Sequence, residues 1–213
     1  LLRFSSAALL ESQGVMPIPP YIRDGIGDNQ DRLDYQSNFA AHSGSVAAPT
    51  ASLHFTPELL KSIAAHGCEV EKITLHVGPA SFLPLWRPDQ TDSITPPGVE
   101  RYNHSPELKS RIISARRAGR RVIAVGTTVV RALESMAANT VATERPLDTD
   151  LFISPGFSFK IVDAVITNFH QPQSTHLLLI ESFLGRKLLE ASYKHALSHA
   201  YRFLSYGDGM LII

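Results

Sequence analysis

The chain has 213 residues, of which 44% are hydrophobic, and its 20 Lys and Arg balance its 20 Asp and Glu. This length allows one sizeable core, and the zero net charge excludes nucleic-acid binding through a basic field spread over the whole molecule. The single cysteine, Cys68, excludes an internal disulfide and paired-cysteine zinc or redox sites, which fits a reducing, cytoplasmic setting. No apolar run approaches the length of a membrane span, so no membrane partner is expected.

The first predicted elements are marked by helix-start signals. Residues 14–34 form a proline-rich connector followed by a loop. The sequences TPE at 56–58 and SPE at 105–107 each supply an N-cap, a proline at the first helical position and an acid near the positive end of the helix dipole. Gly67 and Gly119 then predict where these two helices end.

Strands are predicted between and after these helices. The predicted strands span 72–78, 121–126, 150–156, 160–169 and the last residues before 213. Further helices are predicted at 129–138, 175–184 and 186–200, and a loop at 84–104. This alternation favours an α/β fold with a largely parallel sheet.

A polar turn at 125–135 joins a predicted strand to a predicted helix. Thr127 and Thr128 offer two hydroxyls there, beside free backbone N–H groups and the positive end of the helix dipole. Arg131 lies about one helical turn further on and could supply a charged fork. The turn suits a carboxylate or a phosphate, although any capped turn between a strand and a helix shares these features.

A second polar turn, at 168–175, follows the predicted strand at 160–169. Asn168 and His170 lie at the strand's end, where α/β folds place their chemistry, and imidazole titrates near neutral pH. Ser174 is a good N-cap for the next helix, and Thr175 follows it. This turn therefore offers a candidate base together with groups that could position a ligand.

Two further turns carry polar groups. The turn at 44–60 is built from small residues and contains Thr50 and His54, just before a helix begins. His54 taken alone is explained equally well as a core histidine in a tightly packed turn. The turn at 201–211 groups three polar residues around glycines, and by itself it is an ordinary turn. Its polar residues are Arg202, Tyr206 and Asp208.

Positive charge is concentrated at one place in the chain. Between Arg101 and Arg121 there are seven Lys or Arg and one acid, Glu107. A solvated helix end explains this pattern, since cations are favourable at the negative pole of a helix. A contact with the phosphate backbone of a structured RNA is the alternative. The candidate RNA contacts are Arg116, Arg117, Arg120 and Arg121.

Seven stretches carry a family resemblance that covers nearly the whole chain. They are MPIPPYI (16–22), GSVAAPTASLHFT (44–56), TLHVG (74–78), RVIAVGTTVVRALES (121–135), TDLFISPGFSF (149–159), DAVITNFHQPQST (163–175) and YRFLSYGDGMLI (201–212). In this order they resemble the S-adenosylmethionine:tRNA ribosyltransferase-isomerase family of queuosine biosynthesis.

The resemblance implies an enzyme that moves the ribosyl part of S-adenosylmethionine onto 7-aminomethyl-7-deazaguanine in a tRNA anticodon. The sugar is isomerised to give epoxyqueuosine-tRNA, and adenine and methionine are released. S-Adenosylmethionine is then a co-substrate, with no metal or bound cofactor, and the protein is expected to be a cytoplasmic monomer.

The resemblance also implies an architecture. The family has a barrel-like α/β catalytic domain that carries a small inserted β-barrel domain. Residues 1–13 would be a remnant of the small domain in an N-terminally incomplete chain, and residues 14–213 the main part of the catalytic domain.

The implied reaction assigns work to the polar turns. It needs a base beside the sulfonium, attack by an amine on the sugar, and protonation of the departing adenine. His170, His54 and Asp208, in that order, are the candidates for proton transfer. The candidates for binding substrate are Thr50, Thr127, Thr128, Arg131, Asn168, Ser174, Thr175, Arg202 and Tyr206.

Three departures from the family pattern leave other functions open. The chain reads RPDQTDSITPPGVERYNH at 87–104, where the family usually shows a Met-His-x-Glu-type motif, and HVGPASF at 76–82 in place of HVGxGTF. The helix after the Ser-Thr pair carries an additional His176 and Glu181. A diverged, non-catalytic RNA- or nucleoside-binding paralogue is therefore an alternative, as is a related S-adenosylmethionine or ribosyl transferase acting on a small molecule.

Overall fold

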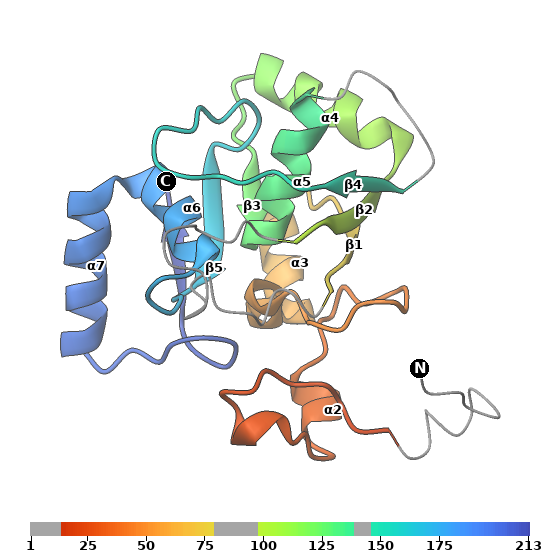
Figure 1. Cartoon of the computed structure of the whole chain (residues 1–213). Coiled ribbons are helices and arrows are strands. Elements are labelled where there is room, and N and C mark those ends of the chain that lie inside the picture. Colours follow the sequence, from red (N-terminus) through yellow and green to blue (C-terminus); the bar gives the residue numbers. More distant parts are fainter. Residues whose placement is uncertain (1–13, 79–97, 139–145) are drawn as a thin grey trace.

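The computed structural model describes residues 14–78, 98–138 and 146–213, and these form a mixed α/β structure (Figure 1). Six strands are arranged in two three-stranded sheets, in the orders β1-β2-β4 and β3-β5-β6. The first sheet comprises β1 (Ile73–His76), β2 (Glu100–His104) and β4 (Leu147–Thr149). The second comprises β3 (Ile123–Val125), β5 (Ala164–Asn168) and β6 (Gly209–Ile212).

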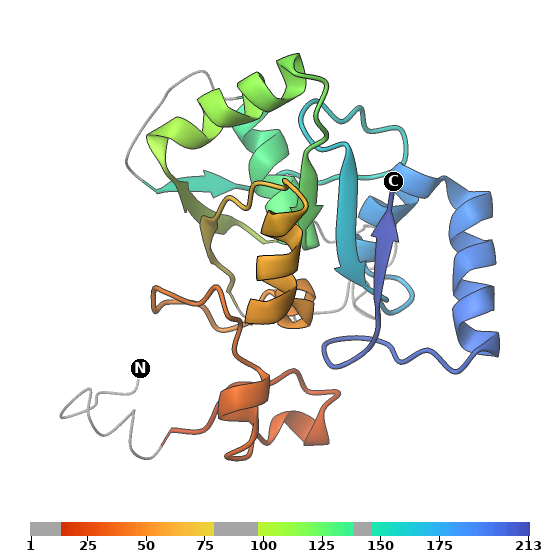
Figure 2. The same cartoon turned by 180° about the vertical axis from the view of Figure 1, so that it is seen from behind.

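Five of the helices have nine or more residues. They are α3 (Pro57–Ala65), α4 (Pro106–Arg117), α5 (Thr127–Ala138), α6 (Thr175–Leu184) and α7 (Arg186–Ser198). The opposite views of Figures 1 and 2 show α5 and α6 on one side of the β3-β5-β6 sheet and α3 on the other side. Helix α7 packs beside α6 at the outside of the molecule.

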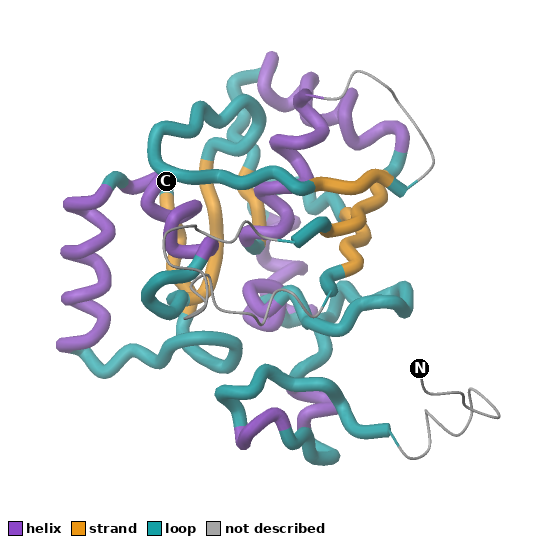
Figure 3. The backbone as a smooth tube through the Cα atoms, in the orientation of Figure 1, coloured by secondary structure: helices purple, strands orange, loops and turns teal. Residues whose placement is uncertain are grey.

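The segment before α3 contributes mainly loops, as Figure 3 shows. It contains the short helix α2 (Asp31–Asp34) and two 3-10 turns, η1 (Arg23–Gly25) and η2 (Thr50–His54). Residues 45–47 run beside the end of β1, where the Val46 N–H donates to the carbonyl of Val77 at 2.9 Å. This contact leads the chain directly into η2, which packs against β5.

Helix α5 joins the two sheets through a shared core. It contacts β1 and β4 of the first sheet and β3 and β5 of the second. Its apolar positions pack with side chains from β5, α6 and β6, which removes them from water and supplies most of the driving force for this arrangement. The core includes Val130, Leu133, Met136, Val165, Leu179, Ile180 and Ile212.

The predicted caps of α3 and α6 are confirmed by their capping contacts, whereas Ser105, the predicted cap of α4, makes no side-chain hydrogen bond to that helix. Thr56 Oγ1 accepts the Leu59 N–H at 3.2 Å at the start of α3, and Ser174 Oγ accepts the Leu177 N–H at 3.2 Å at the start of α6. Gly67 and Gly119 have φ of +78° and +72°, the left-handed conformation that ends helices. These elements follow from local sequence, which explains why they could be predicted.

The prediction of a largely parallel sheet was wrong. Among the strands that the structure describes, only β3 and β5 pair in parallel, whereas β1–β2, β2–β4 and β5–β6 are antiparallel. The strand β2 falls inside the predicted loop at 84–104; the part of that loop up to residue 97 lies outside the described residues. The turn before β6 lies at the carboxyl end of β5, where the Phe169 N–H donates to the carbonyl of Asp208 at 3.4 Å, so β6 starts at that end and runs antiparallel to β5.

The strand predicted at 150–156 was also wrong, and the strand predicted at 160–169 is confirmed only for 164–168. The carbonyl of Leu151 accepts from Arg131, and the N–H groups of Lys160, Ile161 and Val162 donate to the carboxylate of Glu134. Side chains of α5 therefore take the place of a strand partner for these backbone groups.

Candidate functional site

Four polar turns meet at one edge of the β3-β5-β6 sheet. Because β3 and β5 are parallel, their carboxyl ends lie at the same edge, which is where α/β folds place their ligands. Gly126 and Thr127 follow β3, Asn168 ends β5, and β6 begins at Gly209, opposite Asn168. The turn η2 lies against the same edge: a Cβ on Gly126 would be 3.8 Å from that of Ala51. We call this edge the candidate site.

His54 and Asn168 are in contact within this site. Asn168 Nδ2 lies 3.2 Å from His54 Nε2, although the two residues are 114 positions apart in the sequence. The same Nδ2 donates to the carbonyls of Leu204 at 3.0 Å and Gly207 at 3.4 Å. Asn168 is 2% exposed, and its carboxamide therefore ties η2 and the 204–207 turn to the end of β5.

His170 lies in a separate cluster. His170 Nε2 is 2.9 Å from Thr167 Oγ1, and its ring stacks on that of His176 at 5.1 Å between centroids. The His170 backbone N–H donates to Tyr193 Oη at 2.9 Å. Successive side chains of a strand point to opposite faces, so Thr167 and Asn168 direct their partners to opposite sides of β5. The structure therefore does not bring His170 and His54 together into one pair.

The two stacked histidines favour their neutral forms. Burial lowers the pKa of His170 well below its ordinary value, and the neighbouring His176 lowers it further. Burial also lowers the pKa of His176 to about 4, with a smaller contribution from the charge of Arg131. Both residues are partly exposed, but their burial is sufficient to disfavour the charged form of each ring.

This cluster predicts a pH dependence of folding. Between about pH 4 and 6.5 the unfolded chain binds a proton at His176 that the folded chain does not, so the free energy of unfolding falls as pH drops through this window. In a His176→Asn variant we expect the loss between pH 7 and pH 5 to be smaller by about 1–2 kcal/mol. Denaturant unfolding at both pH values measures it, with His66→Asn, an exposed histidine, as control. Equal losses in the wild type and in His176→Asn would contradict the prediction.

Arg131 points into the fold. Its guanidinium pairs with Glu100 at 2.6 Å, with both side chains 8% exposed, and donates to the carbonyls of Leu151 at 2.8 Å, Gly98 at 3.2 Å and Thr149 at 3.4 Å. Burial lowers its pKa, opposed by the nearby carboxylates. The structure thus uses Arg131 to fasten α5 to β2 and β4.

The polar residues of the 201–211 turn are used in two different ways. Asp208 Oδ2 accepts the Arg202 N–H at 2.7 Å, which closes the turn before β6, while the Arg202 side chain is exposed. Tyr206 Oη donates to Asp31 Oδ1 at 2.7 Å, and Asp31 also pairs with Arg23. Tyr206 therefore anchors the segment before α3 to the rest of the molecule.

The remaining predicted ligand-binding residues lie at starts of helices or turns. Ser174 Oγ donates to the carbonyl of Gln171 at 2.8 Å besides capping α6, and it is 7% exposed. Thr175 is the first residue of α6 and Thr50 the first of η2, and both are partly exposed. Thr127 is buried and Thr128 partly exposed at the first turn of α5.

The arginines at the end of α4 divide into two kinds. Arg116 donates to the carbonyl of Lys160 and lies 3.8 Å from Asp163, and Arg120 pairs with Glu69. Arg117 and Arg121 are exposed and form no hydrogen bond or ion pair with the residues that the structure describes. Of these four arginines, only Arg117 and Arg121 therefore carry a guanidinium that no described residue binds.

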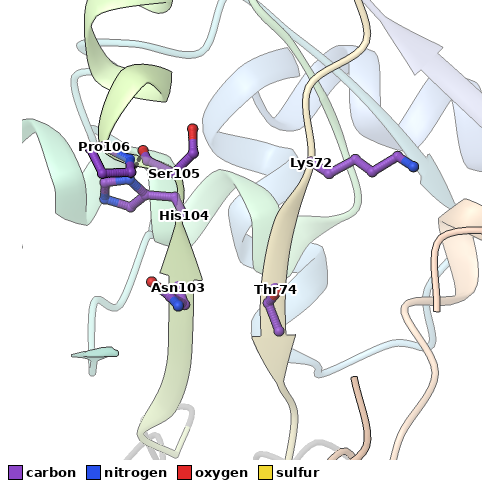
Figure 4. Close-up of a pocket in the computed structure, with 6 residues that line it drawn as sticks. All are labelled: Lys72, Thr74, Asn103, His104, Ser105 and Pro106. Atoms are coloured by element: carbon purple, nitrogen blue, oxygen red, sulfur yellow. Dashed lines mark hydrogen bonds between the residues drawn. The ribbon is translucent and has the colours of Figure 1, made fainter. Parts of the chain in front are cut away.

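Two hollows lie on the outward face of the β1-β2-β4 sheet, away from the candidate site. One, of about 320 Å³, is shown in Figure 4, where Thr74 and Asn103 lie side by side on neighbouring strands. The other, of about 540 Å³, is lined by the row formed by His76, Arg101 and Asp148. Arg101 pairs with Asp148 across this row at 2.8 Å. His76 thus faces outward and lines a hollow.

Sequence reasoning missed the contacts made by Thr167 and Gly209. Thr167 contacts His170, and Gly209 provides the space in which the His54 ring lies. A threonine three residues before a histidine and a glycine at the start of a strand are common, so neither gives a local signal.

Known proteins match the chain over most of its length. Residues 1–212 match the family model described as queuosine biosynthesis protein. The chain belongs to this family. It is 47% identical over 208 residues to an S-adenosylmethionine:tRNA ribosyltransferase-isomerase of Sphingopyxis alaskensis, covering 96% of this chain and 58% of that protein. It is 48% identical over 205 residues to the protein of the same name from Methylocella silvestris, covering 95% and 56%.

A solved structure of the same family has a similar fold. The crystal structure of S-adenosylmethionine tRNA ribosyltransferase from Thermotoga maritima matches with a TM-score of 0.63 and 39% identity, covering 76% of this chain and 51% of that chain. The chain thus spans roughly half to three fifths of the length of these relatives. The residues that replace the family's Met-His-x-Glu-type motif, up to residue 97, lie outside the described residues.

Neither a metal-binding cluster nor a membrane-spanning helix occurs in the described part of this family member. Within residues 14–78, 98–138 and 146–213, no three His, Cys, Asp or Glu side chains are grouped so that they could hold a metal ion. No helix in these ranges is both long enough and apolar enough to cross a membrane.

Proposed function

We propose that this protein transfers and isomerises the ribosyl part of S-adenosylmethionine onto 7-aminomethyl-7-deazaguanine in tRNA, giving epoxyqueuosine-tRNA and releasing adenine and methionine. The observation that supports this most is the meeting of four family-like turns at one sheet edge. His54, Thr127, Asn168 and Asp208 come from distant parts of the sequence and are brought together there. Family membership supports S-adenosylmethionine as the co-substrate.

We propose His170 as the first candidate for proton abstraction. Its ring is neutral at pH 7, so its unprotonated nitrogen can accept a proton from a carbon made acidic by the adjacent sulfonium. One carboxylate oxygen of Asp208 accepts the Arg202 N–H within the turn, and the other oxygen could accept a hydrogen bond from a ligand. His54 is the second candidate for a role in the proton transfers and Asp208 the third, and the contact of His54 with Asn168 affects that role.

The binding roles follow from the same geometry. The first turn of α5, with Thr127 and Thr128, suits the methionine carboxylate, because its free N–H groups and the helix dipole favour an anion. Thr50, Asn168 and Thr175 lie at the same edge and are proposed to position the sugar or the base. Three predicted ligand-binding residues have contacts within the fold, and we propose that they support the site indirectly. They are Arg131, Ser174 and Tyr206.

We propose that tRNA contacts the exposed cations of the chain. Arg117 and Arg121 are suited to phosphate contacts, whereas Arg116 and Arg120 would first have to leave their partners. The outward face of the β1-β2-β4 sheet, which carries Arg101, is a further polar surface that tRNA could contact.

Residues 14–213 would form the main part of a barrel-like catalytic domain, acting in the cytoplasm as a monomer, and residues 1–13 a remnant of a small β domain. Within this domain the exposed Arg202 is proposed as a further residue that binds the substrate.

The test of this function is adenine release by the full-length protein from S-adenosylmethionine, with and without a tRNA carrying the aminomethyl-deazaguanine. We expect release that depends on the tRNA and that falls about 10²- to 10⁴-fold in a His170→Ala variant, since that is the usual contribution of a general base. His66→Ala, an exposed histidine at the end of α3, is the matched control. S-Adenosylmethionine binding without adenine release would contradict the proposal and favour a non-catalytic paralogue.

The proposed tRNA contacts predict a change in salt dependence. Removing one cation that binds a phosphate should reduce the slope of log affinity against log salt by about 0.7–0.9. We therefore expect Arg117→Ala with Arg121→Ala to weaken tRNA binding and to flatten this slope by up to twice that amount. Lys187→Ala with Lys194→Ala on α7, both exposed, removes the same charge elsewhere. The same slope in the two double variants would contradict these contacts.

A further inference from the structure

We infer that Asn168 is a positioning residue that fixes the ring proton of His54 on Nδ1, so that His54 presents a hydrogen-bond donor, and not a base, to the ligand of the candidate site. The identity of that ligand rests on the proposed function. The inference about the proton rests on the geometry around Asn168 alone.

The orientation of the Asn168 carboxamide is determined by two carbonyl groups. Its nitrogen lies 3.0 Å from the carbonyl oxygen of Leu204 and 3.4 Å from that of Gly207. Exchanging the amide nitrogen and oxygen would place three oxygens together with no proton among them, in a site where Asn168 is 2% exposed. The nitrogen must therefore face these carbonyls.

The same nitrogen determines the tautomer of His54. An amide nitrogen has no lone pair available for a hydrogen bond, and its two protons are shared here among three acceptors, so in the contact of 3.2 Å His54 Nε2 can only accept. An Nε2 that accepts cannot also carry a proton. In a neutral ring the proton then lies on Nδ1, which forms no hydrogen bond with the described residues and is available to a ligand.

The ring also lies against Gly209. A Cβ on Gly209 would lie 3.1 Å from His54 Nε2 and 3.3 Å from its Cδ2, which is closer than most side-chain contacts. Glycine thus lets the imidazole lie directly on the start of β6. Asn168 and Gly209 are also register partners, so both constraints on His54 come from one pair of strands.

A buried acceptor accompanies this donor. Asn168 Oδ1 is buried and has no hydrogen-bond partner among the described residues. Buried carboxamide oxygens usually have a partner, and the unpartnered atom here lies on the residue that contacts His54. The site therefore combines a free donor, His54 Nδ1–H, with an unpaired acceptor, as expected where a polar ligand completes the hydrogen bonding.

In the proposed reaction this donor suits the departing adenine. When the bond between the sugar carbon and adenine breaks, its electron pair passes to the base, and a fixed donor at a ring nitrogen stabilises that charge. The proton that adenine finally gains comes from solvent, while His54 keeps its ring proton on Nδ1 and donates it in a hydrogen bond. His54 thus lowers the barrier by a hydrogen bond, and the task of proton abstraction stays with another group.

The tautomer can be measured directly in the wild-type protein by ¹⁵N NMR of labelled histidine rings at neutral pH. The His54 signals are assigned by their absence in His54→Gln. We expect the shift typical of an unprotonated nitrogen at Nε2 and that of a protonated nitrogen at Nδ1. The opposite pattern in the folded wild type would overturn the inference.

Kinetics of adenine release separate the donor from a base. The carboxamide of His54→Gln can accept from Asn168 and still offer an N–H, whereas His54→Ala can do neither. If His54 is a donor, we expect the Ala variant to lose about 10²- to 10³-fold in kcat and the Gln variant clearly less. Equal losses would overturn the donor role, since neither side chain can act as a base. If the wild type releases no adenine, the proposed function fails, while the NMR result still decides the tautomer.

Discussion

Replacing Arg131 by methionine is expected to lower the free energy of unfolding by about 3–5 kcal/mol, because it leaves a buried carboxylate without its cation. Arg131 and Glu100 are each 8% exposed and 2.6 Å apart, so water cannot solvate Glu100 in place of the guanidinium. The substitution also removes the donor to the carbonyls of Thr149 and Leu151. Methionine occupies a similar volume, which keeps the effect of lost packing small.

Denaturant unfolding measures this loss, with Arg117→Met as the exposed control. In a double-mutant cycle, Arg131→Met combined with Glu100→Gln should be less destabilising than the sum of the two single changes, because the unpaired charge is then absent. An Arg131→Met protein that keeps its stability and loses S-adenosylmethionine affinity would instead make Arg131 a ligand-binding residue.

Replacing Glu134 by alanine is expected to cost about 2–5 kcal/mol, because two buried N–H groups and one partly buried N–H group would lose their acceptor. Glu134 is 4% exposed on α5. Its Oε1 accepts from Ile161 and Val162, both at 2.9 Å, and its Oε2 accepts from Lys160 at 2.8 Å. These contacts set the path of the chain into β5, whose far end carries Asn168 and the turn to His170.

A conservative variant separates the hydrogen bonds from the charge. Glu134→Gln keeps one oxygen for Ile161 and Val162 and turns a donor toward Lys160, so we expect a smaller loss than for alanine. Glu190→Ala, on the exposed face of α7, should change the free energy of unfolding by less than about 0.5 kcal/mol. A loss of that small size in Glu134→Ala would contradict the anchoring role.

Local chemistry explains which parts of the fold could be predicted. The starts of α3 and α6 were predicted from Thr56 and Ser174, because capping involves residues only three positions apart. The glycines that end α3 and α4 could be predicted for the same reason. The strand predicted at 150–156 failed because the backbone there bonds to Arg131, a residue about 20 positions earlier whose direction no local pattern reveals.

The candidate site shows the same division. The amino-acid pattern was enough to locate the turns that carry polar groups, to indicate the family, and to place His54, Asn168 and His170 at the ends of elements. Which of these residues contact one another depends on the folded chain. Asn168 contacts His54 across 114 positions, while His170, two residues from Asn168, is directed to the other side of β5. The physical reason is that side chains alternate along a strand, whereas contact between distant turns depends on how the strands pair.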